Sequence, residues 1–302
     1  EVEDADRMLV NESIDPNIAA IHKVCRSVIE YTNYTLATPQ AAEVKAYLHQ
    51  RGLNEECIRK FEIGYNPKGD ALYAYMNAKK FSDADLVASN VVRISPSGMH
   101  DVFAHRILIP IHDRNGNPVG FTARRVDEND GAKYINTSET PAYKKGSLIF
   151  NYHRAKVEAK ATGRILIVEG AMDVIAFEKV GIHDCVATLG TACTREQLML
   201  LKNLHAKCVI CYDGDQAGIN ATYKFGLLAR ELGLHFEVVD NQLGLDPDEI
   251  IDGYGKDELV HMSEKTISWI DFLFRYLQQK YNLENYSQRK EFAVELGREI
   301  NA

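Results

Sequence analysis

The second half of the chain alternates short apolar runs with amphipathic segments, and this alternation limits the fold more than any other feature. The apolar runs, which predict strands, are RILIVEG (164–170), DCVATLG (184–190), KCVICYDGD (207–215) and HFEVVD (235–240). The segments between them, which predict helices, are AMDVIAFEKVG (171–181), TREQLMLLKNL (194–204) with Thr194 as a cap, and QAGINATYKFGLLARELG (216–233). Strands that alternate with helices favour right-handed crossovers and a mainly parallel sheet. We therefore predict an α/β domain in this half of the chain.

The flanking regions follow different patterns. Apolar residues between Ile18 and Ile29 recur at helical spacing, and a second helix is expected from about Pro39 to Arg51. Two strands are expected around a turn at residues 115–118. Residues 241–259 are rich in Asp and Gly and predict a loop, which a helical tail containing Trp269 follows. We predict three parts: a mixed α+β basic region (1–150), the parallel-sheet domain (151–264) and the start of a helical region (265–302).

Composition places the chain among ordinary globular proteins. Of its 302 residues, 45% are hydrophobic and 26% are charged. No apolar run approaches the roughly 18 residues of a membrane helix, and the first residues lack the pattern of a signal peptide, so we expect a cytoplasmic location. Because the chain begins at Glu1 rather than Met and stops within a helical pattern, it is expected to be a piece of a larger protein.

The six cysteines do not form the pattern of a disulfide scaffold in a chain of this length. Cys208 and Cys211 make a CxxC, but they lie in an apolar run and no second Cys or His pair stands at ligand spacing. Buried thiols are therefore expected, rather than a zinc site or a redox motif.

The net charge of −8 argues against a nucleic-acid partner, because phosphates attract basic surfaces. The distribution of the charge weakens that argument. Between His100 and Arg164 the chain has eleven Lys or Arg residues and seven Asp or Glu residues, a local charge of +4. Ordinary solvated charge is the simplest explanation of such a block when it is taken alone.

Carboxylates follow three of the predicted strands or their loops. The pairs are Glu169 and Asp173, Asp213 and Asp215, and Asp246 and Asp248. Because ligands bind at the carboxyl ends of parallel strands, we expect these six acids to share one sheet edge. Their mutual repulsion would raise their pKa values unless a cation shares the site, and Mg²⁺ prefers such oxygen ligands. A metal-assisted phosphoryl-transfer site is the hypothesis that results.

A simpler interpretation assigns the same acids to local structure. Asp213-Gly214-Asp215 can be a turn with a helix cap, and Asp246-Pro247-Asp248 can be a turn before a helix. Each motif alone favours that interpretation, whereas three in this order, each after a strand or its following loop, favour a shared site.

The order EGxxD, DGDxAG and DPD resembles the Toprim domain of bacterial primases, topoisomerases, certain nucleases and recombination mediators. Three upstream segments, KAYLHQRGLNEECIRKFEIGYNP, AHRILIPIHDRNGNPVGFTARR and AKYINTSETPAYKKGSLIFN, resemble the RNA-polymerase core of bacterial DnaG-type primases in order and spacing. This resemblance extends from about Ile18 to the end of the chain. Departures such as Ala171 in place of a common Tyr indicate a divergent member of the kind found in phages or mobile elements.

The resemblance implies roles for particular residues. The six acids match the acidic metal-binding and catalytic positions of the family, with Glu169, Asp213 and Asp215 as the catalytic set. Its basic template-binding and nucleotide-binding positions are matched by Arg106, Arg124, Lys133 and Lys145. Metal ions, Mg²⁺ or Mn²⁺, would be held by the acids, and Glu169 is either a ligand or a general base.

The implied activity is that of a DNA primase, a metal-dependent nucleotidyltransferase that copies single-stranded DNA into short RNA from ribonucleoside triphosphates during replication. Family members also carry an N-terminal zinc module and a C-terminal domain that contacts the replicative helicase. Neither is recognisable in this sequence, so no zinc and no direct helicase contact are expected.

Two other classes of function remain as alternatives. A Toprim topoisomerase or nuclease would break DNA, and a topoisomerase would need a nucleophilic Tyr that no sequence context identifies here. A recombination-mediator-like module would bind DNA on the same sheet without catalysis. Plasmid nicking or ribonucleotide incorporation distinguishes these alternatives from a primase.

Overall fold

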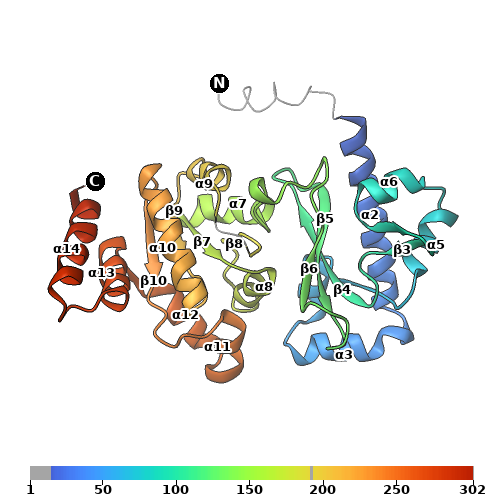
Figure 1. The fold of residues 1–302 in the computed structure, drawn as a ribbon. Helices are drawn as coiled ribbons and strands as arrows, with labels where there is room; N and C mark the ends of the chain where they lie inside the picture. Colours follow the sequence, from blue (N-terminus) through green and yellow to red (C-terminus); the bar gives the residue numbers. More distant parts are fainter. Residues whose placement is uncertain (1–14, 191–192, 302) are drawn as a thin grey trace. The chain divides into compact units, whose positions relative to one another are not determined.

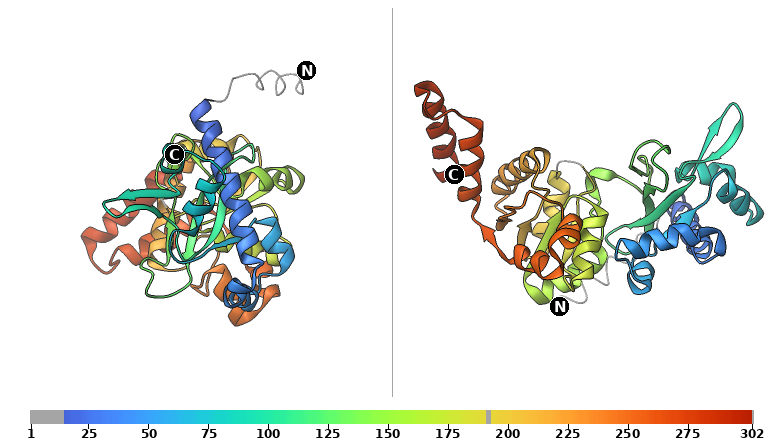
Figure 2. Two further views of the ribbon diagram at one scale, coloured as in Figure 1. Left: turned by 90° about the vertical axis from the view of Figure 1, so that its right-hand side faces the viewer. Right: turned by 90° about the horizontal axis from the view of Figure 1, so that it is seen from below.

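The computed structural model describes residues 15–190 and 193–301, and the chain divides into two compact units. Unit 1 comprises residues up to Ile111 together with Asn117–Lys144, and unit 2 comprises His112–Gly116 and Lys145–Ala302. The ribbon is shown in Figures 1 and 2. Each unit has its own core, and each is described by itself.

Unit 1 is a mixed α and β structure, as predicted. Its helices are α2 (Pro16–Leu36), η2 (Pro39–Ala41), α3 (Ala42–Gln50), α4 (Glu55–Lys60), α5 (Ala71–Ala78) and α6 (Asp83–Ala88). Its strands are β1 (Gly64–Asn66), β2 (Val92–Ser95), β3 (Gly98–Asp101), β4 (Arg106–His112, which runs one residue into unit 2), β5 (Pro118–Arg125) and β6 (Tyr134–Asn136).

The sheet of unit 1 has the order β1-β4-β5-β6, and β2 pairs with β3 in a separate hairpin. Helix α2 packs on this sheet and supplies Ile21, Val24 and Val28 to a core that also holds Phe103 and Phe121. The predicted helices near Ile18 and Pro39 and the two strands around residues 115–118 are confirmed.

Unit 2 contains the predicted alternation of strands and helices. Its strands are β7 (Arg164–Val168), β8 (Cys185–Ala187), β9 (Lys207–Ile210), β10 (Phe236–Val239) and β11 (Thr266–Ile267). Its helices are η3 (Lys145–Ser147), α7 (Tyr152–Thr162), α8 (Ala171–Lys179), α9 (Arg195–Lys202), α10 (Gln216–Glu231), α11 (Pro247–Tyr254), α12 (Lys256–Glu264), α13 (Trp269–Lys280) and α14 (Tyr286–Asn301).

The sheet of unit 2 has the order β11-β10-β9-β7-β8, with β10, β9, β7 and β8 parallel and β11 antiparallel to β10. Alternate residues of each strand face opposite sides, so Ile165 and Ile167 of β7 share a core with α7, α9, α10 and α13. Helices α11 and α12 pack against α8 instead. The predicted parallel-sheet α/β architecture is thereby confirmed (Figure 1).

The sequence prediction of a loop over residues 241–259 is wrong for most of its length. Helix α11 begins after Asp246, whose side chain accepts a hydrogen bond from the Glu249 backbone N–H, and Pro247 occupies its first turn. Gly255, with φ 93°, separates α11 from α12. The Asp and Gly content of this segment therefore marks helix ends, because acids cap helices and glycine interrupts them.

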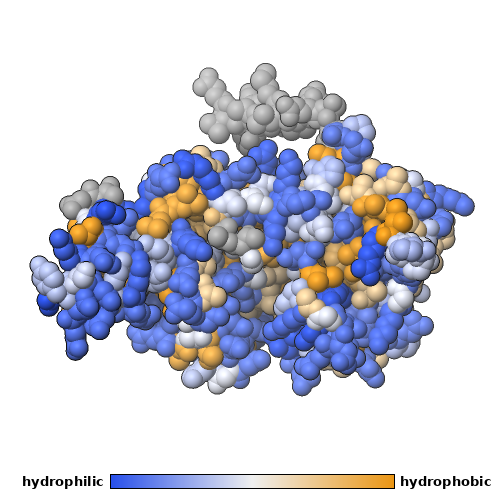
Figure 3. Space-filling model, in the orientation of Figure 1, coloured by the Kyte–Doolittle hydropathy of each residue, from blue (hydrophilic) through white to orange (hydrophobic). Residues whose placement is uncertain are grey.

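All six cysteines are buried and none forms a disulfide, as expected for structural thiols. No helix within the described residues is long and apolar enough to cross a membrane. The face of the molecule in Figure 3 is mostly hydrophilic, with apolar residues in separate small areas.

Candidate active site

The order of the parallel strands reverses next to β7. The chain passes from β7 to β8 on one side and then to β9 on the other, so the carboxyl ends of β7 and β9 lie side by side. Such a switch point is the usual place for a ligand in a sheet of this kind. Glu169 follows β7 directly, and its Oε1 accepts a hydrogen bond from the Asp213 backbone N–H at 3.2 Å. The fold therefore brings the first two predicted acidic segments together.

Two glycines in the DGDxAG segment are required by close packing of the backbone. A Cβ on Gly218 would lie 2.1 Å from the Asp213 carbonyl oxygen and 2.8 Å from Glu169 Oε1. A Cβ on Gly214 would lie 2.4 Å from the Cα of Gly244. A side chain at either position would displace a loop that carries the acids. Glycine at both positions therefore allows the acids to stay at the strand ends.

Asp213 lies among several other carboxylates. Burial raises its pKa to about 7, and the nearby carboxylates of Glu169, Asp246 and Asp215 act in the same direction. Its Oδ1 is buried without a hydrogen-bond partner. A buried acceptor without a donor is costly, and a cation would satisfy it.

Glu169 and Asp173 respond to the same surroundings. Burial raises the pKa of Glu169, and the hydrogen bond from the Asp213 N–H opposes that shift. Burial, followed by the charge of Asp213, raises the pKa of Asp173 well above its ordinary value. The charges of Glu169, Asp213, Asp215 and Asp246 therefore act on one another or on Asp173 at this sheet edge.

Two of the acids also cap helices. Asp215 Oδ1 accepts from the Gly218 N–H at 2.8 Å at the start of α10, and Asp246 Oδ1 accepts from the Glu249 N–H at 2.7 Å at the start of α11. Both the capping interpretation and the shared-site interpretation therefore describe real geometry. Because each cap engages a single carboxylate oxygen, the same side chains retain capacity for a metal ligand.

Asp173 and Asp248 are the most enclosed of the six acids, at 9% and 3% exposure. Asp173 accepts from the Gly170 N–H at 2.8 Å, and Asp248 forms an ion pair with Lys179, also at 2.8 Å. Both carboxylates are therefore engaged within the protein. Lys179 and Glu249 were not predicted from the sequence, although Glu249 stands at the third helical position, where a capping box places an acid.

Basic residues in unit 1 fall into two kinds. Arg106 is 5% exposed, and its guanidinium donates to the carbonyl oxygens of Ala123, Asp130 and Ala132 at 3.3, 2.6 and 3.0 Å. Two of these carbonyls, those of Asp130 and Ala132, belong to the loop between β5 and β6. Lys133, on that same loop, is exposed.

Arg124 of β5 lies between two aromatic rings. Its guanidinium carbon is 5.6 Å from the ring centre of Tyr47 and 5.3 Å from that of Tyr134, whose hydroxyl it also contacts. The rings hold the cation in one place, which suits recognition of phosphate. In unit 2, Lys145 of η3 is half-buried, and its carbonyl oxygen accepts from Gln197 Nε2.

In the part of the chain that the structure describes, no three or more His, Cys, Asp or Glu side chains are gathered tightly enough to form a finished metal centre. The acids nevertheless fit a hard divalent cation, since the donors are all oxygen and Asp213 Oδ1 has no partner. Mutual repulsion is expected to keep such carboxylates apart until a cation joins them.

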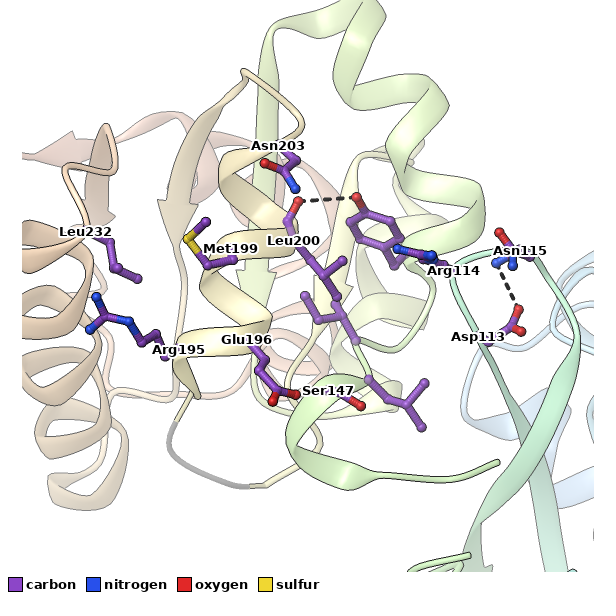
Figure 4. A pocket seen from close by; sticks show the side chains of 13 residues that line it. Asp113, Arg114, Asn115, Ser147, Arg195, Glu196, Met199, Leu200, Asn203 and Leu232 are labelled. Atoms are coloured by element: carbon purple, nitrogen blue, oxygen red, sulfur yellow. Dashed lines mark hydrogen bonds between the residues drawn. The ribbon is translucent and has the colours of Figure 1, made fainter. Parts of the chain in front are cut away.

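A cavity of about 860 Å³ lies elsewhere in unit 2 (Figure 4). Met199 and Leu200 of α9 and Tyr152 of α7 line it, with Arg114 and Glu196 among its polar residues. None of the six acids borders it. Asp213 and Gly214 instead border a smaller cavity of about 140 Å³, which Arg275 and Tyr276 of α13 also line.

Two known protein families match this chain, one in its first half and one in its second half. Residues 31–156 match the family described as DNA primase catalytic core, N-terminal domain, and residues 166–251 match the family described as Toprim-like. The RNA polymerase domain of the Mycobacterium tuberculosis primase DnaG superposes with a TM-score of 0.81 at 27% identity, covering 92% of this chain and 98% of that one. The chain belongs to the DnaG primase catalytic-core family.

Full primases are also similar to this DnaG-type core. A DNA primase of Listeria monocytogenes is 31% identical over 99% of the chain, and one of Geobacillus stearothermophilus is 34% identical over 89% of it. The chain spans 48% and 45% of those two proteins, slightly less than half of each. A DnaG catalytic domain solved with bound single-stranded DNA matches with a TM-score of 0.82 at 28% identity, over 92% of this chain and 91% of that one.

Proposed function

We propose that this chain is the part of a DNA primase that synthesises short RNA from ribonucleoside triphosphates on single-stranded DNA, with Mg²⁺ or Mn²⁺ as cofactor. The observation that carries the proposal is the convergence of Glu169, Asp213, Asp215 and Asp246 at the switch point, with Asp213 Oδ1 unsatisfied. Membership of the DnaG family supports it. The DNA bound by the related catalytic domain supports the choice of template.

The chemistry follows from the position of the acids. A ribose 3′-hydroxyl oxygen forms a bond with the α-phosphorus of the incoming nucleotide, and the bond from that phosphorus to the β-phosphate oxygen breaks. Pyrophosphate leaves, and the hydroxyl proton has to be accepted. Divalent metal, when bound, supplies charge neutralisation for the phosphates and a lowered pKa for the hydroxyl.

The residues of the chain would share that work. Glu169, Asp215 and Asp246 would hold the metal together with Asp213, because their charges act on Asp213, whose Oδ1 has no partner. Glu169 has a raised pKa and a backbone contact that fixes it beside Asp213, which suits a group that accepts the proton.

The basic side chains would bind the template and the nucleotide. Arg124, Lys133 and Lys145 are proposed to contact phosphates, and Arg106 to support Lys133 through the carbonyls of the loop that precedes it. Since the family resemblance places the helicase contact in a separate C-terminal domain, no helicase contact is proposed for the described residues.

The test is incorporation of labelled ribonucleotides on a single-stranded DNA template, with Mg²⁺, with Mn²⁺ and with a chelator. We expect short products that alkali destroys and that require added metal. A chain that instead nicks or relaxes plasmid DNA, and incorporates nothing, would contradict the proposal in favour of a Toprim nuclease or topoisomerase.

A further inference from the structure

One ion pair in unit 2 joins two helices that are far apart in the sequence. Lys179 is the last residue of α8, and Asp248 lies in the first turn of α11. Lys179 Nζ lies 2.8 Å from Asp248 Oδ1, and each side chain is only 5% exposed. Two charges are seldom removed from water together unless their geometry compensates for the lost solvation.

The helix ends explain why this pair can be buried. A cation at the carboxyl end of a helix and an anion at the amino end of a helix are each in the favourable half of the helix dipole. The pair therefore fastens the first turn of α11 to the body of α8.

That same turn carries the acids that act on Asp213. Asp246 and Glu249 form a reciprocal cap, in which each side chain accepts from the backbone N–H of the other. Both carboxylates contribute to the raised pKa of Asp213, so they lie within electrostatic reach of it. The amino end of α8 is itself adjacent to Glu169. Helix α8 thus connects the strand end that carries Glu169 to the turn that carries Asp246.

We propose that Lys179 is a positioning residue for the metal site, and that Asp248 serves as its anchor rather than as a metal ligand. This inference rests on the proposed function, because it concerns the site where metal would bind. It divides the six acids. Glu169, Asp213, Asp215 and Asp246 remain directed to metal, Asp248 is paired with Lys179, and Asp173 accepts from the Gly170 N–H.

The alternative, in which Asp248 ligates the metal, makes the opposite prediction for Lys179. A lysine that competes with metal for a ligand weakens metal binding, so its removal should leave the affinity unchanged or increase it. If Lys179 holds the α11 turn, its removal should weaken metal binding, because Asp246 loses its position. The sign of one measurement therefore separates the two roles.

The experiment measures Mn²⁺ binding by calorimetry or electron paramagnetic resonance, below the melting temperature of each variant. Lys179→Met is expected to weaken Mn²⁺ binding about 10-fold or more, the usual effect of losing a group that orients a metal ligand. Lys179→Arg, which keeps the charge, should restore most of it. Lys160→Met, an exposed lysine at the end of α7, is the matched control and should bind Mn²⁺ like the parent.

Asp248→Asn tests whether Asp248 is a metal ligand, even if Lys179→Met fails to fold. Its amide oxygen can still accept from Lys179, so the loss of Mn²⁺ affinity should be smaller than in Lys179→Met. A loss as large as that in Asp213→Asn would overturn the inference, as would unchanged or tighter Mn²⁺ binding in Lys179→Met. In both cases the proposed function would stand. No Mn²⁺ binding by the parent chain would overturn both.

Discussion

Two charged groups, one in each unit, are buried in opposite ways. In unit 1, the guanidinium of Arg106 is buried, and three backbone carbonyls accept its hydrogen bonds. In unit 2, Asp213 is half-buried among other carboxylates, and its Oδ1 has no donor. A buried charge whose polar atoms have protein partners is compatible with a structural role, whereas a buried carboxylate oxygen without a donor indicates a ligand that the protein is built to receive. Burial alone does not separate the two.

The strongest test of this contrast is Asp213→Asn. A neutral amide ligates Mg²⁺ poorly, so metal-dependent RNA synthesis should fall by at least about 100-fold, equivalent to a loss of a few kcal/mol of transition-state stabilisation. The melting temperature without metal should be unchanged or higher, since one of several like charges is removed. Asp252→Asn, an exposed acid on α11, is the matched control.

Metal titration and thermal melting of Asp213→Asn and Asp252→Asn test the contrast between Arg106 and Asp213. Equal metal affinity together with a lowered melting temperature in Asp213→Asn would mean that the acid serves the fold, as Arg106 does.

A second test concerns unit 1, where it compares Arg106 with Lys133. Arg106→Ala removes hydrogen bonds from three carbonyl oxygens and should lower the free energy of unfolding by about 2 to 3 kcal/mol. Lys133→Ala, by contrast, should change that free energy by less than about 0.5 kcal/mol. It should weaken binding to single-stranded DNA and reduce the salt dependence of binding by about one phosphate contact. Denaturant unfolding and DNA titration at several salt concentrations measure both.

The outcome that reverses this assignment is specific. An Arg106→Ala variant that is as stable as the parent, yet fails to bind DNA, would make Arg106 a direct template contact, as the family resemblance implies.

A third test concerns the pH dependence of stability. With a folded-state pKa of about 7 and an unfolded value of 3.8, Asp213 binds more protons in the folded state between those two pH values. Stability without metal should therefore fall as the pH rises from about 4 to about 7, and Mg²⁺ should restore it at the upper end, where protons no longer compete. Melting temperatures across this range check the sign.

The slope should be shallower in Asp213→Asn than in the parent. It should not vanish, because the pKa values of Glu169 and Asp173 are raised in the same sense. A melting temperature of the metal-free parent that rises over this range would contradict the electrostatic description of the site.

Much of the fold was predictable because it depends on periodicity. The alternation of apolar runs and helical segments after Arg164 predicted the parallel strands β7, β8, β9 and β10 but not the antiparallel β11, and Thr194 was correctly expected to cap α9. The segment 241–259 was misjudged because Asp and Gly are common both in loops and at helix ends. Only the burial of Ile250 and Leu259 distinguishes the two, and burial depends on tertiary contacts.

The sequence indicated which acids belong to the candidate site, but not the role of each acid. Position after a strand identified the six acids, yet nothing in the sequence showed that Asp248 has Lys179 as its partner, because 69 residues separate them. Likewise, an arginine in a basic stretch is equally compatible with a phosphate and with carbonyl oxygens. The sequence shows which residues are charged. Which of those charges already have a partner within the protein depends on the fold.

The packing of Trp269 has a practical consequence for experiments on this molecule. It is the single tryptophan of the chain, it is 5% exposed, and a Cβ on Gly226 of α10 would lie 2.1 Å from its ring. Intrinsic tryptophan fluorescence therefore reports the docking of α13 on α10 and nothing in unit 1. Spectroscopists can follow the unfolding of unit 2 by emission alone, with circular dichroism as the complementary signal for the whole chain, and so learn whether the two units unfold together.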